Sequence, residues 1–154
     1  MSKEPSKLSI ILFDDDAEFA EDTAALLRDY LVRDLSRERE LEVIVVNRPN
    51  KAIDAISMAA KDSVLLTDLQ VEDRYPFEVW ERADEQGTKI ALYSNLAVED
   101  DERVKRIARQ FKMYPLTKTE SISTVVNYIQ KEFPRYFKKE SELKDTDFGE
   151  GKRK

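Results

Sequence analysis

The sequence predicts an α/β fold, a single doubly wound sheet of five parallel strands. Five short apolar runs alternate along the chain with five stretches whose apolar residues recur at helical spacing. The runs are nearly continuous in apolar residues, which is typical of strands that are covered on both faces. Strands that alternate with helices form right-handed crossovers, and these place helices on both sides of a parallel sheet.

The expected strands are short and rich in β-branched or other apolar residues. In chain order they are Leu8–Phe13, Leu41–Val46, Val64–Thr67, Thr88–Tyr93 and Met113–Thr117. Each is followed by turn-forming or charged residues, so each should end where its apolar run ends.

The first expected helix runs from about Ala17 to about Arg37, with the charged stretch Ser36–Glu40 as the turn. Either Arg48 or Asn50 precedes the second helix. Both helices carry apolar residues on one face only, so they should pack against the sheet with that face.

Pro76 suits the first turn of the third helix, and Gly87 suits its C-terminal end. The last two helices show apolar residues at clear helical spacing: Val104, Ile107, Ala108 and Phe111, then Ile122, Val125, Val126, Ile129 and Phe133. The sequence does not decide whether the fifth helix ends near Phe133 or extends to Phe137. The aromatic residues expected in the core are Phe77, Trp80 and Phe111.

The amino-acid composition excludes several classes of function. The 154 residues suit one domain, with net charge −6 and no basic stripe to bind nucleic acid. Cysteine and histidine are both absent, which excludes disulfides, thiolate metal sites and Ser-His-Asp catalysis. No apolar run approaches the length of a membrane span, and the N-terminus lacks a signal peptide's apolar segment. We therefore expect a cytoplasmic protein without membrane contact.

Chemistry-bearing side chains stand at the ends of four expected strands. Asp14 and Asp15 follow the first strand, Asp68 the third, Ser94 the fourth and Lys118 the fifth. Because ligands of such folds bind beyond the carboxyl ends of the strands, these residues should converge. Like-charged acids destabilise one another unless a cation or a reaction uses them. The set suits a phosphoryl group and a divalent metal such as Mg²⁺, which prefers carboxylates and phosphate oxygens.

In these residues and their strand placement the chain resembles the response-regulator receiver domain of the chemotaxis-regulator type, over about residues 8–132. The resemblance implies a (βα)5 flavodoxin-like receiver fold, with Asp68 as phosphoacceptor. It also implies a Mg²⁺ pocket of Asp14, Asp15, Asp68 and the backbone carbonyl of Gln70. Ser94 would be the switch hydroxyl and Lys118 the phosphate contact. Asp16, the third acid of the run, is expected to cap the first helix.

The resemblance further implies a histidine kinase or phosphotransfer protein as phosphodonor. It implies signalling without enzymatic turnover of a substrate beyond self-phosphorylation and self-dephosphorylation. We expect residues 1–7 to form an N-terminal arm, residues 8–137 the receiver domain, and residues 138–154 a charged, mobile tail. With so short a tail, the output should be a protein partner, met through residues 99–133, and a homodimer is left open.

The sequence departs from the family pattern beside the site. Thr119 follows Lys118 where proline is usual, Asn95 follows Ser94 where a small residue is usual, and Pro115 stands at the usual aromatic switch position. These departures leave open a pseudo-receiver, an adaptor of the same fold that does not use phosphorylation.

A third hypothesis is a phosphatase that resembles the haloacid dehalogenases. Residues Phe13–Asp16 resemble that family's nucleophile motif, and Ser94 and Lys118 its next two motifs. Glu18 stands where that family has threonine or valine, and Asp68 would have no role. We therefore rank this hypothesis below the other two.

Overall fold

The computed structural model describes residues 7–95 and 101–138. Its sheet has five parallel strands in the order β2-β1-β3-β4-β5. The strands are β1 (Lys7–Phe13), β2 (Glu40–Val46), β3 (Asp62–Thr67), β4 (Lys89–Ser94) and β5 (Tyr114–Thr117). The predicted fold class is therefore confirmed. The outer parts of the expected arm, tail and partner surface (residues 1–6, 139–154 and 99–100) lie outside the described residues.

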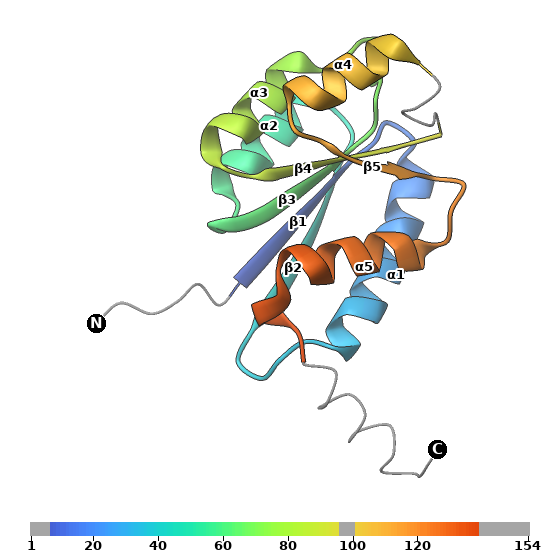
Figure 1. Cartoon of the computed structure of the whole chain (residues 1–154). Helices are drawn as coiled ribbons and strands as arrows, with labels where there is room; N and C mark the ends of the chain where they lie inside the picture. Colours follow the sequence, from blue (N-terminus) through green and yellow to red (C-terminus); the bar gives the residue numbers. More distant parts are fainter. Residues whose placement is uncertain (1–6, 96–100, 139–154) are drawn as a thin grey trace.

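Helices cover both faces of the sheet (Figure 1). They are α1 (Ala17–Arg33), α2 (Pro49–Met58), α3 (Phe77–Gln86), α4 (Glu102–Gln110) and α5 (Ile122–Glu132). Helices α1 and α5 lie on one face, and α2, α3 and α4 lie on the other. Two apolar layers result, because alternate residues of each strand point to opposite faces. Among the described residues, no helix combines the length and apolarity needed to cross a bilayer.

The helix ends follow from local chemistry. Asp16 lies just before α1, and its carboxylate accepts the backbone N–H of Phe19 at 3.1 Å, which confirms the predicted cap. Gly87 ends α3 with φ of 80°, a left-handed conformation that glycine adopts without steric cost. Arg48 precedes α2, with Pro49 in the first turn of that helix.

Helix α1 ends at Arg33, so the expectation that it continues to about Arg37 is wrong. Leu35 instead forms an antiparallel bridge with Phe137. The N–H of Ser36 donates to the carbonyl of Tyr136 at 2.9 Å. These contacts with a distant part of the chain satisfy backbone groups that a longer helix would have used.

The segment after α5 is anchored to the amino end of the sheet. Pro134 cannot donate a backbone hydrogen bond, so the α-helix ends at Glu132 and a 3-10 turn, η2 (Pro134–Tyr136), follows. The Tyr136 hydroxyl donates to Asp62 at 2.6 Å, and Arg135 pairs with the same carboxylate. The fifth helix therefore does not extend to Phe137, and the residues after it form a separate turn.

One expected core residue lies at the surface. Phe77 is 40% exposed, whereas Trp80 and Phe111 are buried as predicted. Phe77 is the first residue of α3 and lies edge-on to Trp80, with ring centroids 5.4 Å apart. It therefore covers the rim of the core rather than filling it.

Candidate functional site

The carboxyl ends of β1 and β3 bring the acidic residues together. The two strands pair directly, and the N–H of Asp68 extends their ladder by donating to the carbonyl of Phe13 at 2.9 Å. Asp14 and Asp15 follow Phe13 in the chain. One oxygen from each of Asp14, Asp15 and Asp68 lies within 4.8 Å of the others. Acids that are 54 residues apart in sequence therefore share one small volume because β1 and β3 are neighbours.

Lys118, from the turn after β5, reaches back across the strand ends into this cluster. Its Nζ lies 2.5 Å from Oδ2 of Asp14 and 3.4 Å from Oδ2 of Asp68. All three side chains are largely shielded, with 10%, 1% and 18% exposure for Lys118, Asp14 and Asp68. The ammonium therefore neutralises part of the buried acidic charge.

The shielding changes the ionisation of Asp68. Burial raises the pKa of this carboxyl, Lys118 lowers it and the charge of Asp14 raises it, and the net result is a pKa of about 6. Burial works to lower the pKa of Lys118, but the hydrogen bonds and charges of Asp14 and Asp68 outweigh it, so this pKa is raised. Lys118 is thus a fixed cation at neutral pH, and Asp68 is an unusually basic carboxylate.

The donor set fits a hard divalent cation. Carboxylate oxygens are the protein ligands that Mg²⁺ prefers, and it needs only one or two of them besides water and phosphate oxygens. Asp14 is buried, with Oδ1 accepting the Asp16 N–H at 2.9 Å, whereas Asp15 is exposed to solvent. The cluster thus offers a rigid oxygen and an accessible one.

A tight turn after Asp68 holds Asp15 in place. Val71 and Arg74 exchange backbone hydrogen bonds of 2.9 and 3.1 Å, and the Glu72 N–H donates to Oδ2 of Asp15 at 3.0 Å. The two central residues, Glu72 and Asp73, have φ of 55° and 65°. Glutamate rarely adopts this left-handed conformation, so the turn is strained. The hydrogen bonds to Arg74 and Asp15 hold this strained turn, and with it the loop that also contains Gln70.

Two buried side chains that the sequence did not assign to the site, Thr67 and Trp80, fix the backbone of Asp68. Thr67 is fully buried and donates its hydroxyl to the Asp68 carbonyl at 2.8 Å. The indole N–H of Trp80 in turn donates to the Thr67 hydroxyl at 2.9 Å. A buried tryptophan usually finds such a partner, and a threonine next to the key acid was the available signal in the sequence.

Phe19 is a second feature that the sequence did not assign to the site. The Nζ of Lys118 lies 4.7 Å from the centre of its ring, in the range of a cation–π contact. The same ring packs against Tyr93 at 5.9 Å. Phe19 therefore contacts the Lys118 ammonium itself and helps to hold it beside the acids.

Ser94 and Gln70 complete the predicted set. The carbonyl of Ser94 accepts the Lys118 N–H at 2.9 Å, so this buried serine lies at the same end of the sheet. Gln70 lies in the exposed loop between Asp68 and the strained turn. Their hydroxyl and carbonyl contacts with a phosphoryl group or metal stay predictions, as do the roles of the other site residues.

Comparison with solved structures identifies the fold. A response-regulator receiver domain protein (CheY-like) from Methanospirillum hungatei superposes with a TM-score of 0.68 at 16% identity, over 85% of this chain and 97% of that one. The chain has the receiver fold. Response regulator receiver proteins from Burkholderia phymatum (TM-score 0.62, 16% identity, 83% and 94% coverage) and Pseudomonas putida (0.62, 12%, 85% and 99%) are similar. No protein-family model matches the sequence, and no curated protein matches it.

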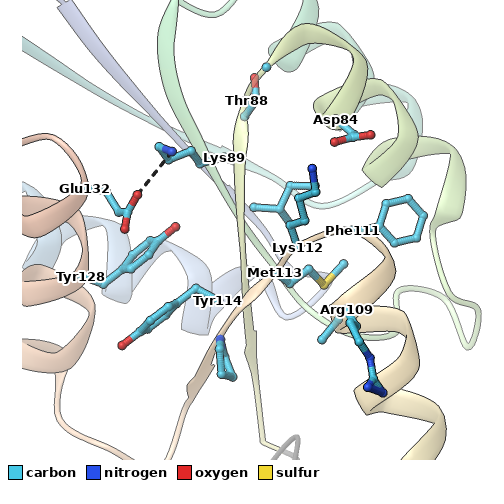
Figure 2. Close-up of a pocket in the computed structure, with 14 residues that line it drawn as sticks. Asp84, Thr88, Lys89, Arg109, Phe111, Lys112, Met113, Tyr114, Tyr128 and Glu132 are labelled. Carbon is cyan, nitrogen blue, oxygen red and sulfur yellow. Dashed lines mark ion pairs between the residues drawn. The ribbon is translucent and has the colours of Figure 1, made fainter.

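A pocket of about 730 Å³ lies elsewhere on this receiver fold, between the ends of α4 and α5 (Figure 2). Its lining includes Lys89 at the start of β4, so it is at the far end of that strand from Ser94. Tyr114 and Tyr128 stack in it with centroids 4.6 Å apart, and Lys89 pairs with Glu132 at 3.4 Å. The pocket is therefore separate from the acidic cluster.

Proposed function

We propose that the chain is a phosphoaccepting receiver that takes a phosphoryl group on Asp68 and signals to a protein partner. The observation that carries this proposal is the arrangement at Asp68, a largely buried carboxylate 3.4 Å from Lys118 in a cluster with two further acids. The receiver fold of the similar structures supports it. The donor would be a histidine kinase or a phosphotransfer protein.

The chemistry follows from the charges. An oxygen of Asp68 forms a bond to phosphorus, the bond from phosphorus to the donor's histidine nitrogen breaks, and the nitrogen keeps the electron pair. Lys118 is positioned to pair with an oxygen of the transferred group, since its Nζ already contacts Asp68. The Thr67 and Trp80 hydrogen bonds hold the Asp68 backbone still during the transfer.

A divalent cation would complete the site. Asp14, Asp15, Asp68 and the carbonyl of Gln70 would hold Mg²⁺, which neutralises the oxygens of an incoming phosphoryl group. The acids need such a cation, because Lys118 supplies one positive charge against three carboxylates.

The output would pass through the surface of residues 99–133. Ser94 is proposed to donate its hydroxyl to a phosphoryl oxygen, a hydrogen bond that exists only after phosphorylation. β5 pairs with β4 directly beside Ser94, in the register Ser94 to Thr117. At the other end of these two strands, the pocket with the stacked Tyr114 and Tyr128 opens on this surface (Figure 2). A protein partner with an exposed apolar side chain would suit that pocket.

Beryllofluoride with Mg²⁺ tests this proposal, because it mimics a phosphoryl group on aspartate. Amide NMR shifts should change for residues around Asp68 and across residues 101–133, and Asp68→Asn should abolish both changes. An unchanged spectrum of the wild type at saturating beryllofluoride and Mg²⁺ would refute phosphoacceptance.

One observation favours the pseudo-receiver as a second candidate. Pro115 lies in β5 where the family has its aromatic switch residue, and the adjacent Tyr114 is stacked on Tyr128 rather than directed at Ser94. In a pseudo-receiver, Asp68→Ala would leave the cellular function intact, whereas in a phosphoacceptor it would abolish it. The phosphatase hypothesis has no such support, since Oδ1 of Asp16 already caps α1.

A further inference from the structure

Strand β2 forms an open edge of the sheet. Within residues 7–95 and 101–138, it pairs with β1 only, over all seven of its residues and without a bulge. Its residues Leu41–Val46 are only partly buried. An unprotected edge strand offers a row of backbone donors and acceptors to another strand.

Alternate residues of β2 direct their backbone groups to this open edge. The N–H of Asp14 donates to the carbonyl of Val46 at 3.1 Å, so Val46, and by alternation Ile44, face β1. The odd-numbered residues therefore face outward. The carbonyl of Val43 accepts a hydrogen bond from the Arg28 side chain at 3.4 Å, which independently shows that it is not used by β1.

The opposite edge of the sheet is protected, and β2 is not. β5 has only four residues, and one of them is Pro115. The Lys118 N–H donates to β4, so by alternation the backbone nitrogen of Pro115, three residues earlier, faces the outer edge. Proline has no N–H, so Pro115 offers no donor to a further strand. β2 has no proline and no lysine in its sequence ELEVIVV. Only the β2 edge can accept a further strand along its whole length.

We propose that a second copy of this chain pairs with the β2 edge, antiparallel and centred on Val43, to form a symmetric dimer with a continuous sheet. Each Val43 then exchanges two backbone hydrogen bonds with the other Val43 across the two-fold axis. Leu41 and Val45 exchange bonds in the same way. The Arg28 hydrogen bond to Val43 is given up when the strands pair.

The register about Val43 pairs all seven residues of β2 with the same seven residues of a second copy, and it keeps the acids apart. Pairing about Val43 places Glu42 opposite Ile44 and Glu40 opposite Val46, so no acid faces another acid. A register shifted to centre on Glu42 would place the two Glu42 side chains opposite each other, which is destabilising. The strand is therefore complementary to itself over its full length. The dimer does not depend on Asp68, so it can succeed or fail independently of the proposed phosphorylation.

Sedimentation equilibrium of the full chain tests the dimer. The mass should rise with concentration from 17.9 kDa towards twice that value. Val43→Pro removes an outward N–H without touching the ladder to β1 and should shift the dissociation constant at least tenfold. Val43→Ala, which loses side-chain contacts but keeps the N–H, should still dimerise. A wild type that stays monomeric to millimolar concentration, or a Val43→Pro protein that dimerises equally well, overturns the proposal.

Hydrogen exchange of the wild type gives a second test that needs no variant. The amides of Leu41, Val43 and Val45 should exchange at least tenfold more slowly at high than at low protein concentration. The amide of Ile44, which faces β1, should change less. Equal exchange at both concentrations contradicts the strand pairing even if Val43→Pro does not fold.

Discussion

Lys118 Nζ lies 2.5 Å from Oδ2 of Asp14, and both side chains are almost completely shielded from water. A buried charge is costly without its partner, because the loss of hydration is no longer offset. This ion pair joins the strand ends of β1 and β5, which are not neighbours in the sheet. It therefore links the proposed metal-binding acids to the proposed phosphate contact.

Replacing Lys118 should destabilise the fold through Asp14. We expect Lys118→Met to lower the free energy of unfolding by about 3 kcal/mol, since it leaves a buried carboxylate unpaired. Adding Asp14→Asn should restore most of the loss, because the unpaired charge is then removed. Urea unfolding without Mg²⁺ measures both, with the exposed Lys51→Met as control. Additive losses in the double variant would contradict the coupling.

The raised pKa of Asp68 predicts a pH dependence of stability in Mg²⁺-free buffer. The folded pKa of about 6 exceeds the ordinary value of 3.8, so the folded protein binds more protons between these pH values. The stability due to this group is present below about pH 4 and is lost as the pH rises through 6. Asp68→Asn should therefore be more stable than the wild type at pH 7, by about 1 kcal/mol or more.

Thermal unfolding across pH 4 to 8 checks this expectation. The exposed Asp84→Asn serves as the matched control and should leave the pH profile unchanged. A wild-type profile that keeps the same slope after Asp68→Asn would show that other groups cause it.

The adjacent acids Asp15 and Asp16 should respond differently to substitution. Asp15 offers an accessible oxygen to the metal, so Asp15→Asn should weaken Mg²⁺ binding at least tenfold, measured by calorimetry. Asp16→Asn should not, because Asp16 lies outside the acidic cluster and asparagine caps a helix as well as aspartate does, so α1 is kept. Asp16→Ala should cost about 1 kcal/mol of stability and still bind Mg²⁺. Equal losses of Mg²⁺ binding in Asp15→Asn and Asp16→Asn would refute this division.

The strained turn beside the site should be open to stabilisation. Glu72→Asn should raise the free energy of unfolding by about 0.5–1 kcal/mol, since asparagine adopts positive φ more readily. The N–H that Asp15 accepts is kept. Glu120→Asn, in an exposed turn without positive φ, should show no such gain. Chemical denaturation compares the two, and a destabilised Glu72→Asn protein would contradict the assigned strain.

The sequence predicted the fold well, because hydrophobic spacing marks the strands and helices. It also predicted which acids meet, since parallel strands end at one edge and Asp14 and Asp68 each follow such a strand. It failed where distant contacts decide the local structure. The end of α1 depends on the bridge from Leu35 to Phe137, and no local pattern shows that contact.

The surroundings of the site were harder to predict than its acids. Nothing in the sequence indicates that Glu72 adopts a left-handed conformation to reach Asp15, because glutamate seldom does so. The contact of Lys118 with Phe19 depends on the packing of α1 against the sheet, which periodicity alone does not place. Tertiary packing determines the positions of such side chains, and the spacing of apolar residues along the sequence does not predict that packing.

Intact-mass analysis after incubation with acetyl phosphate tests the central claim most directly. With Mg²⁺, the wild type should gain the mass of one phosphoryl group, and the gain should be lost without Mg²⁺ and in Asp68→Asn. Asp84→Asn should be modified like the wild type. A wild-type protein that remains unmodified under conditions that phosphorylate a known receiver, or an Asp68→Asn protein that gains the same mass, would contradict the assignment of Asp68 as phosphoacceptor.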